Sequence, residues 1–329
     1  MTSAAAPITF ADQLGNVGLV SRVNLWLHAM PHPSLVVEIA PRHVAAARWG
    51  ATKGRLEAAA VEILPAGSVM PSPVEANIPQ PEAVRGALRH VFQRVPIDGA
   101  SVALLIPDSA VRLFILPFDT LPRRASEALP LLRWRLKKSV PFDVDEAVVS
   151  WFRQTGRTGG LEVVAAIARQ RIVREYEQIV ESLAGHAGVV MGSSLAAVPL
   201  LSEHGTQMLV RLSGKTLTTA VVNGSNLCVF RSTELPGEVE QLQPQNVIEE
   251  VFPAVAYYQD TWKEQVDTAL LAGFGDREGF FRAALESELK IHASSIADAE
   301  SARGLEQEAK DLVHHGLDSL AGWMMNEGS

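Results

Sequence analysis

The first candidate for chemistry in this 329-residue sequence is a short Gly-Lys-Thr segment. Ser213-Gly214-Lys215-Thr216 matches the end of the phosphate-binding P-loop, where backbone N–H groups and a lysine hold phosphate oxygens. The full motif requires a glycine five places before Gly214, but that place holds Leu209. Apolar strand-like runs also flank the segment on both sides, whereas a P-loop opens a helix. The pattern therefore predicts a hairpin turn.

The other candidates for nucleophilic or metal chemistry fit structural roles. The single cysteine, Cys228, lies in an apolar strand-like run, which predicts a small buried hydrophobe. None of the nine histidines has the spacing of a metal site, and the chain has no Gly-x-Ser-x-Gly motif. The acidic residues Asp143, Asp145 and Glu146 directly follow a predicted helix and are typical of a solvated turn. We therefore expect neither a metal site nor a catalytic residue.

Composition narrows the classes of partner. Hydrophobic residues make up 47% of the chain and charged residues 20%, as in ordinary globular proteins, and the formal net charge is −8. Because nucleic acid is itself anionic, this balance disfavours it as a partner. No apolar run is long enough to span a bilayer, and no basic segment precedes an apolar one at the N-terminus. These features predict a cytoplasmic protein without a signal peptide.

Cations gather in one predicted helix. It runs from about Arg124 to Ser139, after an apolar strand that ends at Pro117. Its cations are Arg123, Arg124, Arg133, Arg135, Lys137 and Lys138. The helical spacing predicts a buried stripe of Ala128, Leu131, Leu132 and Leu136, with Trp134 near its edge. Such a basic face is either solvated or a docking surface for anionic lipid headgroups or an acidic partner.

The elements around this helix predict a small unit of their own. The strand Val111–Leu116 precedes the helix, and two strand-like runs, Val148–Gln154 and Leu161–Ala168, follow it. An amphipathic helix then begins near Arg169. The order strand, helix, strand, strand, helix predicts an α/β insert at about residues 108–186.

The rest of the chain contains an internal duplication. A strand–turn–strand–strand pattern followed by a helix begins at Leu35 and again at Met208. We therefore predict an α/β fold with two related lobes, residues 34–207, which include the insert, and residues 208–298. Residues 1–33 are expected to form a segment with an amphipathic helix, and residues 299–329 a helical C-terminal tail.

This organisation resembles a known architecture. Two related lobes with ribonuclease H-like repeats, facing a cleft, resemble the actin, Hsp70 and hexokinase superfamily. The stretch Leu113–Val148 and the hairpins of Val210–Arg231 resemble the PilM-type proteins of type IV pilus assembly, which are actin-like. FtsA cell-division proteins and the GspL cytoplasmic domain of type II secretion are also similar. GspL continues into a membrane span, whereas this sequence has no apolar run long enough for one. FtsA ends in a basic amphipathic helix, whereas the patch Trp323-Met324-Met325 lacks cations. Both differences favour PilM.

The resemblance implies a nucleotide site, but its motifs are altered. In proteins of this fold, each strand that enters a phosphate turn carries an aspartate for Mg²⁺ and then a glycine that lets the backbone approach the phosphate. The matching positions are Glu38-Ile39-Ala40 and Arg211-Leu212-Ser213. Arg211 could pair with Glu38 across the cleft or hold a phosphate, but an arginine cannot ligate Mg²⁺. We therefore expect a pseudo-ATPase that does not hydrolyse ATP.

These changes leave nucleotide binding open. The glycine pair Gly273 and Gly275 could admit an adenine, or could form a plain strand-to-helix turn. The candidate residues for binding ATP or ADP are Glu38, Arg42, Arg211, Ser213, Gly214, Lys215, Thr216, Gly273 and Gly275.

The resemblance also implies a function and a partner. PilM proteins are scaffolds that bind the cytoplasmic tail of the bitopic membrane protein PilN and link the inner-membrane pilus platform to its motor. We expect a PilN-like tail to bind where the insert meets the first lobe, which gives a peripheral membrane association through partners. Val23-Asn24-Leu25 resembles such a tail and could fill the groove in cis or bridge a neighbour. The alternative is an active ATP-dependent enzyme or filament of the actin or sugar-kinase type.

Overall fold

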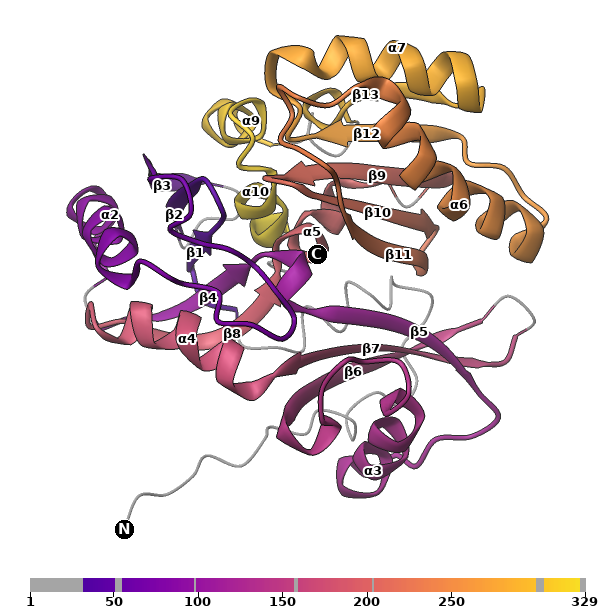
Figure 1. Ribbon diagram of the computed structural model, residues 1–329, viewed down its shortest axis with the longest axis horizontal. Coiled ribbons are helices and arrows are strands. Elements are labelled where there is room, and N and C mark those ends of the chain that lie inside the picture. Colours follow the sequence, from indigo (N-terminus) through magenta and orange to yellow (C-terminus); the bar gives the residue numbers. More distant parts are fainter. Residues whose placement is uncertain are drawn as a thin grey trace.

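The computed structural model describes residues 32–50, 55–97, 99–156, 159–202, 204–299 and 305–325 (Figure 1). These residues form two five-stranded sheets and one three-stranded sheet. The predicted N-terminal helix and the tail-like segment Val23-Asn24-Leu25 lie outside the described residues.

The first lobe is built on a mixed sheet of order β3-β2-β1-β4-β8. Its strands are β1 (Leu35–Ile39), β2 (His43–Trp49), β3 (Leu56–Ile63), β4 (Ser101–Ile106) and β8 (His186–Gly192). Two helices, α2 (Pro81–Arg94) and α4 (Gln170–Glu181), share one apolar core with one face of this sheet. The short helix α5 (Ser193–Ala197) belongs to the core on the other face. Both faces are therefore covered, as the near-continuous apolar runs of β1 and β4 require.

The second lobe repeats this topology in a sheet of order β11-β10-β9-β12-β13. Its strands are β9 (Thr206–Ser213), β10 (Thr216–Asn223), β11 (Asn226–Glu234), β12 (Thr268–Ala272) and β13 (His292–Ser295). Helices α6 (Pro244–Trp262) and α7 (Glu278–Leu289) pack on one face. In each lobe the first three strands are antiparallel neighbours and the last two join in parallel. The duplication predicted from the sequence is confirmed.

The insert is an antiparallel sheet of order β5-β7-β6 with one helix on it. Its elements are β5 (Arg112–Phe118), α3 (Ala125–Leu136), the 3-10 turn η2 (Val144–Glu146), β6 (Ala147–Thr155) and β7 (Leu161–Arg169). The prediction that Pro117 ends the first strand was wrong, because β5 continues through Pro117 and Phe118. An edge strand tolerates proline, since one side of its backbone has no ladder bonds to lose, and β5 pairs only with β7.

Helix α3 buries a narrower stripe than its sequence predicted. Ala128, Leu132 and Leu136 are buried against the insert sheet, as expected. Leu131 was wrongly placed in that stripe, since its side chain is 43% exposed, and Trp134 is 73% exposed. The sheet is small enough for one row of side chains at i, i+4 and i+8 to cover it, so Leu131 is left on the outer side.

The C-terminal helices close the space between the lobes. Helix α9 (Gln307–His314) and helix α10 (Asp318–Met325) share a core with α5 and with strands from both lobes. The Trp323 indole stacks on His32 with ring centroids 4.3 Å apart and donates a hydrogen bond of 3.2 Å to the Pro33 carbonyl. The patch Trp323-Met324-Met325 thus packs inside the fold and does not form an exposed apolar face. Within the described ranges, no helix combines the length and apolar character needed to cross a bilayer.

Candidate functional site

The two hairpin turns that hold phosphates in actin-like proteins touch each other here. The β9–β10 turn has Gly214 at φ +58°, in the left-handed region that favours glycine. A Cβ at Gly214 would lie 3.1 Å from Cβ of Pro41, which belongs to the β1–β2 turn. The hairpin prediction for Ser213–Thr216 is confirmed by the register of β9 and β10. Pro41 is a proline and therefore has no backbone N–H to offer a phosphate.

A buried ion cluster lies behind these turns. Arg211 on β9 is 4% exposed and donates a hydrogen bond of 2.8 Å from Nε to Asp318 Oδ2 on α10. Its Nη2 lies 3.3 Å from Glu38 Oε1 on β1, so the structure contains the pairing with Glu38 that was one of the two alternatives for Arg211. The other Glu38 oxygen, Oε2, lies 3.3 Å from His43 Nε2 on β2. A guanidinium and two carboxylates therefore join both lobes and the C-terminal helix, at the two positions predicted to match the metal-binding aspartates of actin-like proteins.

A third buried carboxylate, Asp108, lies in the same region. It follows β4, in the 3-10 turn η1 (Asp108–Ala110), and accepts bonds of 3.0 Å from the Ser194 N–H and from Thr218 Oγ1. The Ser194 hydroxyl also donates to it. Since Ser194 is on α5 and Thr218 is on β10, Asp108 bridges the two lobes in parallel with Arg211.

The cluster shifts the pKa of each of its acids. Burial alone would raise the pKa of Glu38, but the bond to His43 and the charge of Arg211 outweigh it and lower that pKa to about 2. Burial raises the pKa of Asp318, in spite of Arg211, and the charge of Glu38 raises it further. Burial also raises the pKa of Asp108. Glu38 is therefore the carboxylate that most firmly balances the positive charge of Arg211.

The other predicted nucleotide residues do not join this cluster. Arg42 is half-exposed and pairs with Glu238 at 2.6 Å and with Glu240 at 3.5 Å. Lys215 is exposed at the tip of the β9–β10 turn.

Within the cluster, Arg211 keeps one guanidinium nitrogen, Nη1, without a hydrogen-bond partner among the described residues.

The glycine pair after β12 has a packing role. Gly273 has φ +80°, and a Cβ there would lie 1.9 Å from the carbonyl oxygen of Leu212. Gly275 has φ +53° and starts the 3-10 turn η4 (Gly275–Arg277) before α7. Gly273 is thus required by the approach of β12 to the end of β9.

Two members of the site were missed from the sequence. Asp318 opens an apolar helix and Asp108 follows an apolar strand and a proline. A carboxylate bordering an apolar run is a signal for a buried acid, but Asp318 meets Arg211 across 107 residues of sequence. The spacing of neighbouring residues in the sequence cannot predict a contact between residues so far apart.

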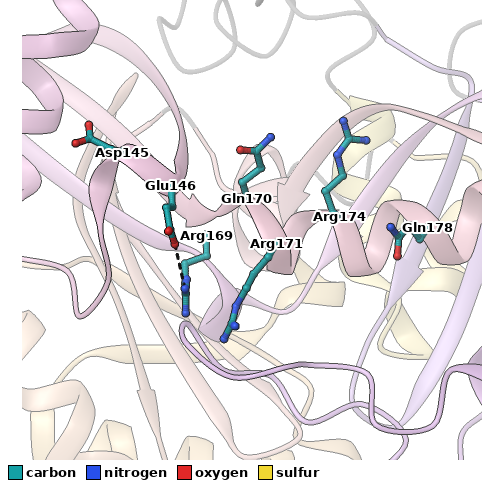
Figure 2. A pocket seen from close by; sticks show the side chains of 7 residues that line it. All are labelled: Asp145, Glu146, Arg169, Gln170, Arg171, Arg174 and Gln178. Carbon is teal, nitrogen blue, oxygen red and sulfur yellow. Dashed lines mark hydrogen bonds and ion pairs between the residues drawn. The ribbon is translucent and has the colours of Figure 1, made fainter. Parts of the chain in front are cut away.

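A second candidate site lies where the insert meets the first lobe, the region expected for a partner tail. An open cavity of about 610 Å³ is lined by Asp145, Glu146, Arg169, Gln170, Arg171, Arg174 and Gln178 (Figure 2). Figure 2 shows Gln170 and Arg174 projecting from the same side of α4 while Arg169 reaches back to Glu146. That ion pair spans 3.2 Å and joins the end of β7 to η2.

The arginine side chains of this cavity differ in how firmly contacts within the protein hold them. Arg169 donates a bond of 3.1 Å to the Val74 carbonyl and is 20% exposed, and Arg171 donates to the same carbonyl. Arg174 is 57% exposed and pairs with Glu177 at 2.9 Å on its own helix. Arg169 and Arg171 are therefore committed to the loop around Val74, whereas Arg174 can reorient toward a ligand at small cost.

The basic face of α3 is a separate surface. Arg123, Arg124, Arg135, Lys137 and Lys138 are exposed there, and Arg133 is partly buried with Nη2 donating to the Ala147 carbonyl at 3.2 Å.

Comparison with known proteins places the fold. No protein-family model and no curated protein matches the chain. Among solved structures, the chain is similar to one titled PilM-PilN type IV pilus biogenesis complex, with a TM-score of 0.72 and 16% identity over 91% of this chain and 100% of that one. It is also similar to a protein from Bacteroides thetaiotaomicron with an actin-like ATPase fold and unknown function, at a TM-score of 0.50, 8% identity and coverage of 92% and 99%.

A third structure is more distant. The cytoplasmic domain of EpsL, an inner-membrane component of the type II secretion system of Vibrio cholerae, overlaps 72% of this chain and 80% of its own at 14% identity. Its TM-score of 0.46 is too low to argue for a relationship. The chain has an actin-like, two-lobed α/β fold, and its resemblance to PilM-type proteins is confirmed at the level of that fold.

Proposed function

We propose that this protein is a non-enzymatic scaffold of the type IV pilus platform, which binds the cytoplasmic tail of a PilN-like membrane protein and links it to the pilus motor. The observation that carries the proposal is the ion pair of Arg211 and Glu38 in an actin-like fold. The similar structure is a PilM-PilN complex by its title, which supports a PilN-like partner for this chain. Such a scaffold acts at the inner membrane from the cytoplasm.

The charge of Arg211 is the argument against ATP hydrolysis. Phosphoryl transfer needs a metal ion between the phosphate oxygens to neutralise developing charge. A guanidinium buried at the metal position excludes a divalent cation by repulsion, and its two closest carboxylates already serve it. We therefore expect the actin-like fold to serve here without ATP hydrolysis, with Arg211 and its carboxylates between the lobes.

The cavity at the insert is the proposed site for the tail. An extended peptide presents backbone groups that the amides of Gln170 and Gln178 can bind, and Arg174 can pair with a carboxylate of the peptide. The two walls are joined by the ion pair of Glu146 on η2 with Arg169 at the end of β7. A preformed groove limits the ordering cost to the peptide itself.

The test combines a peptide titration with a nucleotide titration. A fluorescent peptide that copies the PilN tail of the PilM-PilN complex is titrated with the protein, and Arg174→Glu is compared with Arg89→Glu, an exposed site on α2 of the same lobe. We expect Arg174→Glu to weaken binding at least about tenfold and Arg89→Glu to leave it unchanged. ATP is titrated calorimetrically with and without Mg²⁺, and released phosphate is measured in the same samples.

Each result has a definite meaning. No phosphate release together with binding of the peptide supports the scaffold. Mg²⁺-dependent hydrolysis refutes it and favours an active enzyme or filament. Equal affinity of the two variants refutes the cavity as the tail site.

A further inference from the structure

The outer side of α3 carries an exposed tryptophan at its centre. Trp134 is 73% exposed and Leu131, one turn before it, is 43% exposed. At 100° per residue, Trp134 lies opposite the buried stripe of Ala128, Leu132 and Leu136. An indole in that position gains little from the core of this chain and is available to another surface.

Exposed cations lie close to this tryptophan in the sequence. We call Leu131, Trp134, Lys137 and Lys138 the α3 outer face; Arg135 is exposed at its flank, and Arg123 and Arg124 precede it at the start of the helix. Residues 123–138 hold six cations and one carboxylate, Glu127, in a chain of net charge −8. The next carboxylate along the chain is Asp143. A local excess of positive charge in an acidic protein is a feature that the fold itself does not require.

Most of these cations form no ion pair with acidic residues of the part of the protein that the structure describes. In the part of the chain that the structure describes, Arg124 reaches Glu127 at 3.7 Å, whereas Arg123, Arg135, Lys137 and Lys138 form no ion pair. Most other exposed arginines with a partner hold it much closer, such as Arg231 and Glu250 at 2.9 Å. The charge of the α3 outer face is therefore available to an anionic surface.

The position of α3 leaves this face accessible. The opposite side of the insert sheet turns toward the second lobe, where Gln154 exchanges two hydrogen bonds with the backbone of Leu227, at 2.8 and 3.2 Å. Figure 1 shows α3 at the outer end of the insert, with the β9–β13 sheet at the other end of the molecule. A flat surface can approach α3 without meeting either lobe's helices.

We infer that the α3 outer face docks directly on a bilayer of anionic lipids. An indole with adjacent leucine suits the boundary between headgroups and acyl chains, and lysines on either side of it reach the phosphates. Short basic helices with an aromatic residue at their exposed centre lie in the membrane plane in this way. The inference does not rest on the tail-binding site, which is formed by η2, β7 and α4.

Vesicle flotation tests the inference. Purified protein is mixed with vesicles of phosphatidylcholine and phosphatidylglycerol in equal amounts, or with vesicles of phosphatidylcholine alone. We expect the protein to float with the anionic vesicles and not with the neutral ones. The paired change Lys137→Glu and Lys138→Glu should weaken binding at least about tenfold, and Trp134→Ser should weaken it at moderate salt, where charge attraction is screened.

A control with the same change in net charge separates the face from bulk charge. Arg89→Glu with Lys290→Glu alters two exposed cations elsewhere, one in each lobe, and should leave flotation nearly unchanged. All variants are checked for an unchanged melting temperature, since every altered side chain is exposed. The inference is overturned if both paired variants lose binding alike, or if the unaltered protein does not float. An acidic protein partner would then be the use of this face. Neither result affects the peptide titration.

Discussion

Arg211 Nε and Asp318 Oδ2 are 2.8 Å apart in the interior of the protein, and this contact ties β9 of the second lobe to the helix α10 that packs on the first. The guanidinium also meets Glu38 of β1, so one side chain spans three segments of the chain. Side chains of the protein therefore join the two lobes and the C-terminal helix through one buried ion cluster.

Replacing Arg211 by methionine should destabilise the protein strongly. The change keeps an apolar stem but leaves the buried Glu38 and Asp318 without their cation, which costs on the order of 3–5 kcal/mol. Urea unfolding followed by circular dichroism measures the loss. Arg231→Met, at a half-exposed pair with Glu250, is the matched control and should cost under about 1 kcal/mol. Similar losses in the two variants would show that the buried cluster contributes little.

Glu38→Gln should remove a pH-dependent part of the stability. The folded-state pKa of Glu38 is lowered from 4.5 to about 2, so its stabilisation is present above pH 4.5 and is lost as the pH falls toward 2. The shift corresponds to on the order of 3 kcal/mol at neutral pH. Asp108 and Asp318, whose pKa values are raised, act in the opposite sense and favour the folded state as the pH falls.

The comparison with wild type isolates the Glu38 contribution. Unfolding free energies are measured across the acid range for wild type, Glu38→Gln and the surface control Glu250→Gln. The gap between wild type and Glu38→Gln should be widest at neutral pH and should close below pH 4.5. A gap that stays constant with pH would contradict the lowered pKa.

Gly273→Ala should be costly although only a methyl group is added. A Cβ at this position would lie 1.9 Å from the Leu212 carbonyl oxygen, and the backbone has φ +80°. Either β12 or β9 must shift, so we expect a loss of more than about 2 kcal/mol in thermal or urea unfolding. Gly279→Ala, in the first turn of α7 with nothing within 4 Å of its Cβ, should be neutral or slightly stabilising. Equal stability of the two variants would exclude the close contact.

Trp323→Ala should lower stability by about 3–5 kcal/mol, because the fully buried indole leaves a cavity and the Pro33 carbonyl loses its donor. Trp134→Ala removes an indole that is 73% exposed and should change stability by less than about 1 kcal/mol. Calorimetric melting of both variants measures these changes in stability. A large effect at Trp134 would mean that the α3 outer face packs against something within the protein.

The sequence predicted the parts of this structure that depend on local pattern. The repeated strand order follows from two similar series of apolar strand-like runs separated by turns, and the Gly214 turn from the glycine between two strands. The pairing of Glu38 with Arg211 was within reach because both sit at matching positions of the repeat. Asp318 was missed because its partner is 107 residues away, and the position of Leu131 because the width of the insert sheet is a tertiary property.

The contact between Trp323 and Pro33 joins residues 290 positions apart in the sequence. A ribosome adds roughly 5–20 residues per second, so β1 emerges roughly 15–60 s before the helix that covers its inner face. During that time the side of the first sheet that includes Val36 and Ala45 lacks the cover of α10, although α5 and strands of the second lobe in the same core have already been made. Completion of the first lobe's core therefore waits for a segment 290 positions further along the chain, and the nascent protein is a natural client for chaperones until residue 323 has been made.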